Sequence, residues 1–206
     1  MGDKRGAGKA RSRKTRYLFW KRILDIVFSC LLLFFLAIPM LVICLCVSLS
    51  SRGGAIFRQT RVGRGGRKFI CYKFRTMYRD APPNVPTSVF EGASLYITPV
   101  GRFLRRTSLD ELPQLINVLK GDMSLIGPRP LIGEETEMHR MRMESGVYSL
   151  RPGITGLAQV SGRDSLADEQ KAALDARYAE NVCFLSDLRI LGRTLGRVIG
   201  GDGVAR

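Results

Sequence analysis

Two adjacent carboxylates and a guanidinium flanked by prolines stand about twenty residues apart in the middle of the chain. The carboxylates belong to Asp110 and Glu111, just ahead of Pro113, and the guanidinium belongs to Arg129 in the run Gly-Pro-Arg-Pro at 127–130. Prolines restrict the backbone of this run, so the cation is expected in a rigid turn. An acidic pair and a fixed cation are what a site handling a metal-bound phosphate needs.

The residues around the acidic pair predict that it lies at the start of a helix. Ser108 is a good N-cap, and proline at position 113 is tolerated only within the first turn of a helix. Asp110 and Glu111 then lie in that first turn, where the helix dipole favours negative charge and helps keep both side chains ionised. Acidic residues in a first helical turn are also ordinary capping chemistry, so this fragment alone leaves a purely structural role open.

A basic segment precedes the acidic pair, on an expected pair of strands. Residues 55–59 and 68–74 are predicted as two short strands around the glycine-rich run RVGRGGR. This run lacks the GK[ST] ending of a Walker loop, so we expect a basic turn near headgroups or phosphate and no nucleotide cradle. Lys73 and Arg75 alternate with Tyr72 and Phe74, which predicts that both cations share one face of the strand.

The segments on either side of the acidic pair differ in character. Arg105 and Arg106 end the segment before it, and four apolar residues with helical spacing follow it and are predicted to pack in the core: Leu115, Ile116, Val118 and Leu119. The lone histidine, His139, falls in a charged helix predicted over 134–144. We expect it at the surface, because no acid or nucleophile motif surrounds it.

An apolar run of 27 residues extends from Ile23 to Leu49 and contains only four residues that are not plainly apolar: Asp25, Ser29, Pro39 and Ser48. A straight helix of this length is about 40 Å long, more than the roughly 30 Å of a bilayer core, so a tilted span is one possibility. Pro39 kinks a helix and divides the run into arms of about 16 and 10 residues, neither long enough to cross. A re-entrant helix would keep both flanks on one face.

The charge distribution favours the re-entrant arrangement and a membrane surface as partner. Residues 1–22 contain nine Lys or Arg and one Asp, and residues 52–79 contain nine and no acid, in a chain of net charge +15. Basic residues at both ends of the apolar run give no clear orientation for a simple span. The clusters are typical of contacts with anionic headgroups, and no nucleic-acid motif accompanies them. They also favour attraction of anionic substrates.

The basic flank before the apolar run supplies a candidate anchor for the membrane helix. Asp25 follows Lys21 by four residues and Arg22 by three, so its carboxylate can pair with either cation at the interface. Upstream, the Gly, Lys, Arg and Ser content of residues 1–16 predicts disorder. The five cysteines have no spacing typical of a disulfide framework or a zinc site, which fits a reducing cytosolic face.

Several motifs in order make the chain resemble the bacterial sugar transferases, the monotopic phosphoglycosyl transferases. They are YKFRTM at 72–77, SLDELPQLINVLKGDMSLIGPRPL at 108–131 and RPGITGLAQV at 151–160, and the resemblance covers roughly residues 21–194. It implies a broken helix that enters and leaves one leaflet. It also implies transfer of a sugar phosphate from a UDP-sugar to polyprenol phosphate, with Mg²⁺ screening the diphosphate.

The resemblance also implies roles for individual residues. Asp110 is then the nucleophile, Glu111 acts beside it in metal binding or acid–base chemistry, and the cations that contact phosphate or substrate are Lys73, Arg75, Arg105, Arg129 and Arg163. This sequence departs from the family at Asp164, where Asn is common, and at Ala167, near a position often occupied by Trp. These departures leave the sugar and nucleobase contacts open.

Two further features of the C-terminal part have alternative interpretations. Asp175 and Tyr178 match the family's D-x-x-Y pattern and can either reach the site or stabilise their own helix. Residues 184–199 combine apolar positions with Arg189, Arg193 and Arg197, as expected of an amphipathic helix lying on a membrane, although a helix packed on the core fits as well.

Together these features predict an α/β fold, mostly helical with a small sheet, carried by a re-entrant membrane helix. The expected divisions are a basic tail over 1–16, the membrane helix over 17–50, a catalytic domain over 51–200 and a tail over 201–206. The enzyme is expected on the cytoplasmic face of the bacterial inner membrane. Two alternatives remain: direct attack by lipid phosphate with Asp110 as a metal ligand, and a non-catalytic membrane adaptor.

Overall fold

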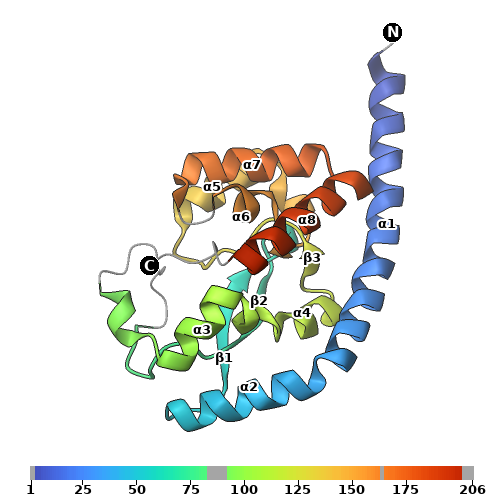
Figure 1. Cartoon of the computed structure of the whole chain (residues 1–206). Helices are drawn as coiled ribbons and strands as arrows, with labels where there is room; N and C mark the ends of the chain where they lie inside the picture. The colour runs from blue at the N-terminus through green and yellow to red at the C-terminus, as the bar shows by residue number, and fades with distance from the viewer. Residues whose placement is uncertain (1–2, 83–91, 163–164, 201–206) are drawn as a thin grey trace.

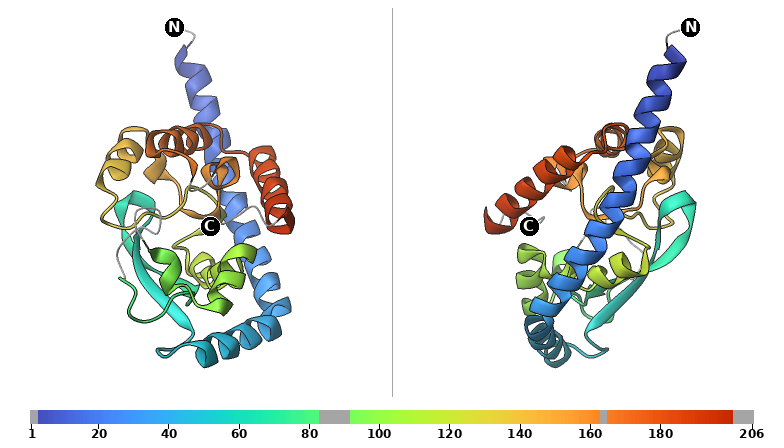
Figure 2. Two further views of the ribbon diagram at one scale, coloured as in Figure 1. Left: turned by 60° about the vertical axis from the view of Figure 1, so that its left-hand side comes forward. Right: turned by 90° about the vertical axis from the view of Figure 1, so that its right-hand side faces the viewer.

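A long helix with a bend near its middle runs along one side and one end of the molecule (Figure 1). The computed structural model describes residues 3–82, 92–162 and 165–200. Helix α1 (Asp3–Phe35) stands against the side, and its N-terminal end extends beyond the rest of the chain in both views of Figure 2. Helix α2 (Ala37–Ser50) turns away by 65° and passes across the end of the domain.

The bend has a direct cause in the sequence. Pro39 is the third residue of α2; it has no N–H to donate to the preceding turn, and its ring excludes the carbonyl of Phe35 from a helical position. The break therefore falls at Leu36, three residues before the proline. It divides the apolar run into arms over 23–35 and 37–49, each about 20 Å long at 1.5 Å per residue. Among the described helices none is long and apolar enough by itself to cross a membrane, but this bent pair together meets that criterion.

The start of α1 differs from the expected disorder. The helix begins at Asp3, inside the basic tail predicted over 1–16. The Ala, Lys and Arg residues of this segment are good helix formers, and a helix already formed downstream extends at low cost. The end of the segment also contacts the domain, because Lys14 Nζ donates to the carbonyl of Ala179 at 2.7 Å.

The two expected strands form an antiparallel hairpin. Strand β1 (Ile56–Val62) pairs with β2 (Lys68–Phe74), with Ile56 opposite Phe74 and Val62 opposite Lys68. The basic turn between them contains the short 3₁₀ helix η1 (Arg64–Gly66). The alternation of apolar and polar side chains predicted this hairpin. The C-terminal part of β2 carries side chains of the site described below.

The acidic pair lies in a 3₁₀ turn between two helices, and this corrects the predicted helix start. Helix α3 (Pro99–Thr107) ends at Ser108, whose left-handed φ of 56° makes it the C-cap of α3. The turn η3 (Leu109–Glu111) follows, and α4 (Gln114–Lys120) begins only after Pro113. The preference of serine for N-cap positions predicted that a helix begins at Ser108, but the preceding helix α3 ends there.

Helix α4 presents a mixed apolar and polar face to the interior. Leu115 and Val118 are buried as predicted, whereas Ile116 is 43% exposed and corrects the expected core set. Two buried polar residues, Gln114 and Asn117, share the inward face. Asn117 ties α4 to strand β2, since its Oδ1 accepts from the N–H of Tyr72 at 3.0 Å and its Nδ2 donates to the carbonyl of Ile70 at 2.6 Å.

The C-terminal half wraps short parallel strands with helices. Strands β3 (Ser124–Ile126) and β4 (Gly153–Thr155) pair in parallel, and four helices pack around them, α5 (Thr136–Glu144), α6 (Leu157–Ser161), α7 (Asp168–Glu180) and α8 (Phe184–Gly200). A 3₁₀ helix, η4 (Val147–Ser149), follows α5, and another, η2 (Ala93–Tyr96), lies earlier in the chain, just before α3. The mostly helical architecture with small sheets fits the predicted α/β class.

Helix α8 has the expected amphipathic character. Ile190 is buried at 1% exposure and packs with Tyr178 and Ile126 in the core. Along the other side, more than half of each of three leucine side chains is exposed: Leu185, Leu188 and Leu195. One face of the helix therefore joins the core, as one of the two interpretations expected, and the other carries apolar side chains to the surface. Contact of that surface with a membrane stays a prediction.

Candidate active site

The turn that carries Arg129 is fixed by close backbone contacts with the start of strand β4. The N–H of Gly127 donates to the carbonyl of Thr155 at 2.8 Å, and the N–H of Gly153 donates to the carbonyl of Pro128 at 2.8 Å. A Cβ at Gly153 would stand 2.0 Å from the nitrogen of Gly127, so only glycine allows this approach. The predicted rigid turn is therefore held by a neighbouring strand as well as by its prolines.

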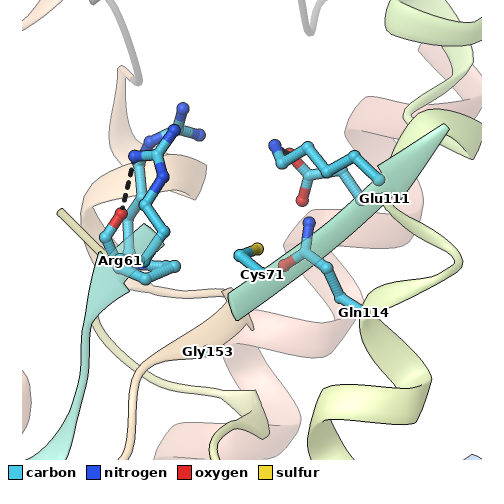
Figure 3. A pocket seen from close by; sticks show the side chains of 8 residues that line it. Arg61, Cys71, Glu111, Gln114 and Gly153 are labelled. Atoms are coloured by element: carbon cyan, nitrogen blue, oxygen red, sulfur yellow. Dashed lines mark hydrogen bonds and ion pairs between the residues drawn. The ribbon is translucent and has the colours of Figure 1, made fainter. Parts of the chain in front are cut away.

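An open pocket lies where this turn, strand β2 and the acidic turn η3 meet (Figure 3). The residues that line it come from segments far apart in the chain: Arg61, Cys71, Lys73, Glu111, Gln114, Arg129, Pro130 and Gly153. Three of the eight are cations and one is a carboxylate. Such a lining suits a bound anion.

Glu111 of the acidic pair lies in the wall of this pocket. Lys73 Nζ is 2.9 Å from Glu111 Oε1, and the two side chains are 20% and 11% exposed. Asp110, 9% exposed, precedes Glu111 in the same 3₁₀ turn but is not among the residues that line the pocket. The structure thus brings together three residues that the sequence predicted to act in one site, Lys73, Glu111 and Arg129, with Asp110 next to Glu111 in the chain.

Arg61 is a pocket residue that the sequence analysis did not single out. Its Nη1 donates to the carbonyl of Pro130 at 3.0 Å and its Nη2 to Gln59 Oε1 at 2.6 Å. Burial, together with repulsion from Arg129, lowers the pKa of Arg61 to about 10, so the side chain stays protonated at neutral pH. The available signal was its place as the first residue of the RVGRGGR run, which the sequence predicted to lie near headgroups or phosphate.

Gln114 and Cys71 complete the inner wall. Gln114, 2% exposed, follows the acidic turn directly, but the sequence gave no reason to expect a polar side chain pointing inward there. Burial raises the pKa of the Cys71 thiol, which keeps this group protonated and unreactive at neutral pH.

Two predicted phosphate contacts stand outside the pocket lining. The chain leaves the strand after Phe74, and the Arg75 guanidinium lies against Gly53. The N–H of Arg75 still donates to the carbonyl of Ala55 at 2.8 Å just after β2, and a shared face for Lys73 and Arg75 stays a prediction. Arg105 Nε donates to the hydroxyl of Thr76 at 2.8 Å, which links helix α3 to the segment after β2.

Asp175 stabilises the fold and supports the pocket from behind. Its Oδ2 accepts from Arg142 Nη2 at 2.6 Å, and Arg142 Nη1 donates to the carbonyl of Arg129 at 2.7 Å. The side chains of Arg142 and Asp175 are 5% and 1% exposed. Burial raises the pKa of Asp175, an effect that Arg142 opposes.

Tyr178 likewise serves the packing of the domain. Its hydroxyl donates to Asp187 Oδ1 at 2.7 Å, next to the carbonyl of Ile126. Of the two roles that the sequence left open for Asp175 and Tyr178, the geometry favours stabilisation, with Asp175 connected to the site only through Arg142. Arg163 and Asp164 lie outside the described residues.

The predicted anchor residues connect α1 to the domain. Lys21 Nζ pairs with Asp187 Oδ2 at 2.5 Å, and Arg22 donates to the carbonyls of Val118 at 2.6 Å and Leu119 at 3.0 Å. Asp25 Oδ1 accepts from the N–H of Leu125 at 3.1 Å. The expected pairing of Asp25 with Lys21 or Arg22 is therefore corrected, because both cations find partners on α4 and α8.

Within residues 3–82, 92–162 and 165–200, no three His, Cys, Asp or Glu side chains gather closely enough to hold a metal by themselves. Asp110 and Glu111 are adjacent carboxylates in one turn, and Glu111 lines the pocket. Mg²⁺ is commonly bound by one or two carboxylates with substrate phosphates completing its shell, so this donor set fits Mg²⁺ that arrives with a phosphorylated substrate.

Comparison with known proteins identifies the family of this chain. The family model described as bacterial sugar transferase matches residues 16–201. The chain is 40% identical over 205 residues to the undecaprenyl-phosphate galactose phosphotransferase of Salmonella typhimurium, covering 93% of this chain and 42% of that protein. It is 40% identical over 190 residues to the UDP-glucose:undecaprenyl-phosphate glucose-1-phosphate transferase of Caulobacter vibrioides, covering 88% of this chain and 70% of that one.

A smaller relative matches over nearly its whole length. The uncharacterized sugar transferase EpsL of Bacillus subtilis is 38% identical over 187 residues, which cover 89% of each chain. The chain therefore belongs to the bacterial sugar transferase family, as its motifs indicated. It spans less than half the length of the Salmonella protein, and it resembles EpsL in size.

Proposed function

We propose that this chain transfers a sugar 1-phosphate from a UDP-sugar to polyprenol phosphate and releases UMP, the first membrane step of glycoconjugate synthesis. The observation that carries the proposal is the pocket in which Glu111, the neighbour of Asp110 in the acidic turn, meets Lys73, Arg61 and Arg129. Two of the relatives are named for such a transfer to undecaprenyl phosphate. A diphosphate needs its charge neutralised before an anionic nucleophile attacks, and the cationic wall offers that.

The proposed chemistry proceeds in two steps through Asp110. Its carboxylate attacks the phosphorus next to the sugar, an aspartyl phosphosugar forms, and the bond to UMP breaks. The phosphate of polyprenol then attacks the same phosphorus, gives the polyprenyl diphosphate sugar and restores the carboxylate. Two steps let UMP leave before the lipid phosphate arrives, so two anionic substrates need not share a small pocket. If the lipid phosphate attacks directly, Asp110 serves as a metal ligand instead.

The remaining charged residues have supporting roles in this proposal. Asp110 and Glu111 would hold Mg²⁺, which supplies charge neutralisation on the diphosphate. Lys73, which pairs with Glu111 at 2.9 Å, keeps the second carboxylate oriented when no substrate is bound. Arg129 presents a planar fork of donors to phosphate oxygens from a backbone that is already fixed, so little ordering is needed on binding.

Release of UMP is the direct test of this function. The purified full-length chain, supplied with Mg²⁺, polyprenyl phosphate and each of a panel of UDP-sugars, should release UMP with at least one of them. Chelation of Mg²⁺ by EDTA should stop the release, and excess Mg²⁺ should restore it. Absence of UMP with every sugar tested would contradict the proposal, and would favour a membrane adaptor.

For the membrane we propose a re-entrant arrangement at the bacterial cytoplasmic membrane, with the catalytic domain on the cytoplasmic face. It is supported by the 65° bend between α1 and α2 and by the basic residues on both sides of the apolar run. The exposed leucines of α8 also fit contact with a bilayer surface.

Cysteine labelling from outside intact cells tests this arrangement. In a variant without its native cysteines, a probe introduced before Trp20 and one introduced after Arg52 should both escape a membrane-impermeant reagent. Replacing Pro39 by Leu restores the missing N–H, so part of the population should then span the membrane. Labelling at one end in the unmodified helix would contradict the re-entrant arrangement.

A further inference from the structure

One pocket residue carries a buried donor that nothing in the described chain satisfies. Gln114 is 2% exposed, and its amide nitrogen Nε2 has no hydrogen-bond partner among the described residues. Figure 3 shows this amide directed into the pocket, beside Cys71 and below Glu111. Buried polar groups in proteins are almost always paired, so an unpaired donor that points into a pocket indicates a ligand acceptor.

The opposite wall carries a cation without an acidic partner. The guanidinium of Arg61 donates to a backbone carbonyl and to an amide oxygen, and in the described part of the chain no carboxylate lies within ion-pair distance of it. Figure 3 shows Arg61 across the pocket from Glu111 and Gln114. Charged groups that are partly removed from water are normally compensated. Here the strongest neighbouring charge, from Arg129, is of the same sign, and Glu135 and Glu111 compensate it only by weaker attraction without an ion pair.

The chemistry of an occupant follows from these two residues together. It must accept hydrogen bonds from an amide N–H, and it must bring negative charge to the neighbouring guanidinium groups of Arg61 and Arg129. A phosphoryl group, with several negatively charged acceptor oxygens, meets both conditions.

We infer that Gln114 and Arg61 bind the oxygens of one phosphoryl group of the substrate from opposite sides of the pocket. The inference rests on the proposed function, because it assigns these residues to phosphate-bearing substrates of the same site. The phosphoryl group belongs either to the nucleoside diphosphate or to the lipid phosphate. In both cases Gln114 and Arg61 bind the substrate without taking part in bond formation, and their loss weakens binding.

Equilibrium binding to the purified full-length chain in detergent tests the inference. UDP and farnesyl phosphate are titrated separately in buffer containing Mg²⁺, and heat release is measured. Gln114→Met has nearly the same shape as the glutamine but lacks the donor, so the affinity for one of the two ligands should fall about tenfold, the typical effect of one hydrogen bond to a charged group. Arg61→Met should weaken the same ligand by at least as much.

The matched control is Gln170→Met, the same exchange at an exposed position on α7. This variant should bind both ligands as the unmodified chain does. The ligand that loses affinity in the Gln114 and Arg61 variants identifies the source of the phosphoryl group. Unchanged affinity for both ligands, or loss for different ligands in the two variants, would overturn the inference.

A second variant covers the case in which Gln114→Met does not fold, as judged by circular dichroism. Gln114→Glu keeps the shape and places a negative charge beside the phosphoryl group, so it should weaken binding by more than tenfold; binding equal to that of the unmodified chain would overturn the inference. The proposed function is judged separately, by UMP release from the unmodified chain. If no UMP appears but Gln114→Met weakens UDP binding, the function fails and the phosphoryl contact stands.

Discussion

Two ion pairs of similar geometry serve different purposes in this molecule. Lys73 and Glu111 meet at 2.9 Å, and Arg142 and Asp175 meet at 2.6 Å. The first pair lines the pocket and its side chains keep 20% and 11% of their exposure, whereas the second keeps only 5% and 1%. Substrate can therefore reach the first pair and exchange its contacts. The second pair, between α5 and α7, holds helices together.

The two pairs are connected through Arg129. Arg142 donates to the backbone carbonyl of Arg129, while the side chain of Arg129 lines the pocket with Lys73 and Glu111. The buried pair thus supports the position of Arg129, which lines the pocket beside the Lys73–Glu111 pair. In these two pairs, the deeply buried acid Asp175 has a structural role. Glu111, which keeps more access to solvent, belongs to the pocket where we expect the chemistry.

The largest effect on stability is expected at the buried pair. Asp175→Ala leaves Arg142 as an uncompensated buried cation, which costs about 3–5 kcal/mol in such pairs. For a chain of this length that lowers the melting temperature by about 10 °C, measurable by circular dichroism in detergent. Glu137→Ala removes an exposed partner of Arg140 and serves as the control, with little change expected. An unchanged melting temperature for Asp175→Ala would remove the distinction between the two pairs.

The reverse pattern is expected at the pocket. Glu111→Gln keeps the shape of the side chain but removes a charge from the site, so UMP release should fall by about 10²–10³-fold, the usual range for loss of one electrostatic contribution. Because Lys73 retains access to water, stability should change by less than about 1 kcal/mol. Loss of folding together with activity would show that Glu111 is a structural residue like Asp175.

Arg129 lies between the two regions, and a conservative exchange separates its contributions. Arg129→Lys keeps the charge and the backbone carbonyl that accepts from Arg142, but loses the planar fork of donors. UMP release should therefore fall about ten- to hundredfold, the range expected when hydrogen bonds to a charged group are lost, while the melting temperature stays the same. Near-normal turnover would show that Arg129 contributes only its backbone.

The smallest effect concerns Cys71, which lines the pocket without a proposed role. Burial raises the pKa of this thiol above its usual value near 9.0, so iodoacetamide at pH 8 should modify exposed Cys183 well before Cys71, as followed by mass spectrometry of the peptides. Since the folded chain holds this proton more tightly than the unfolded chain, the contribution of Cys71 to stability falls as pH rises above 9. Equal labelling rates would contradict the burial of Cys71.

Part of this arrangement was accessible from the sequence because it follows local patterns. The alternation around Lys73 predicted the hairpin, Pro39 predicted a broken helix, and the motifs around Asp110 and Arg129 predicted the family. Local patterns gave a wrong prediction where a residue belonged to the helix on its other side. Ser108 has the chemistry of a helix start, yet it ends α3 in a left-handed conformation.

The remaining part depends on contacts between distant segments, which no local pattern contains. Arg142 and Asp175 are 33 residues apart, and no pattern in either segment predicts that they form an ion pair. Arg61 and Gln114 reach one pocket from β1 and α4. Arg61 begins the RVGRGGR run and Gln114 follows the acidic pair, but no local pattern shows that the two side chains meet. Such residues become visible only when the chain is folded and the unsatisfied groups can be identified.

The central claim is that Asp110 becomes covalently linked to a sugar phosphate, and mass spectrometry tests it most directly. The purified chain is given Mg²⁺ and a UDP-sugar that it accepts, without lipid, and the peptide containing Asp110 is analysed. The account predicts a mass increase of one sugar phosphate on this peptide, and its absence in Asp110→Asn, which should fold and bind membranes normally. Comparable UMP release by Asp110→Asn with polyprenyl phosphate present, with no adduct on the unmodified chain, would contradict the claim and establish direct attack by the lipid phosphate.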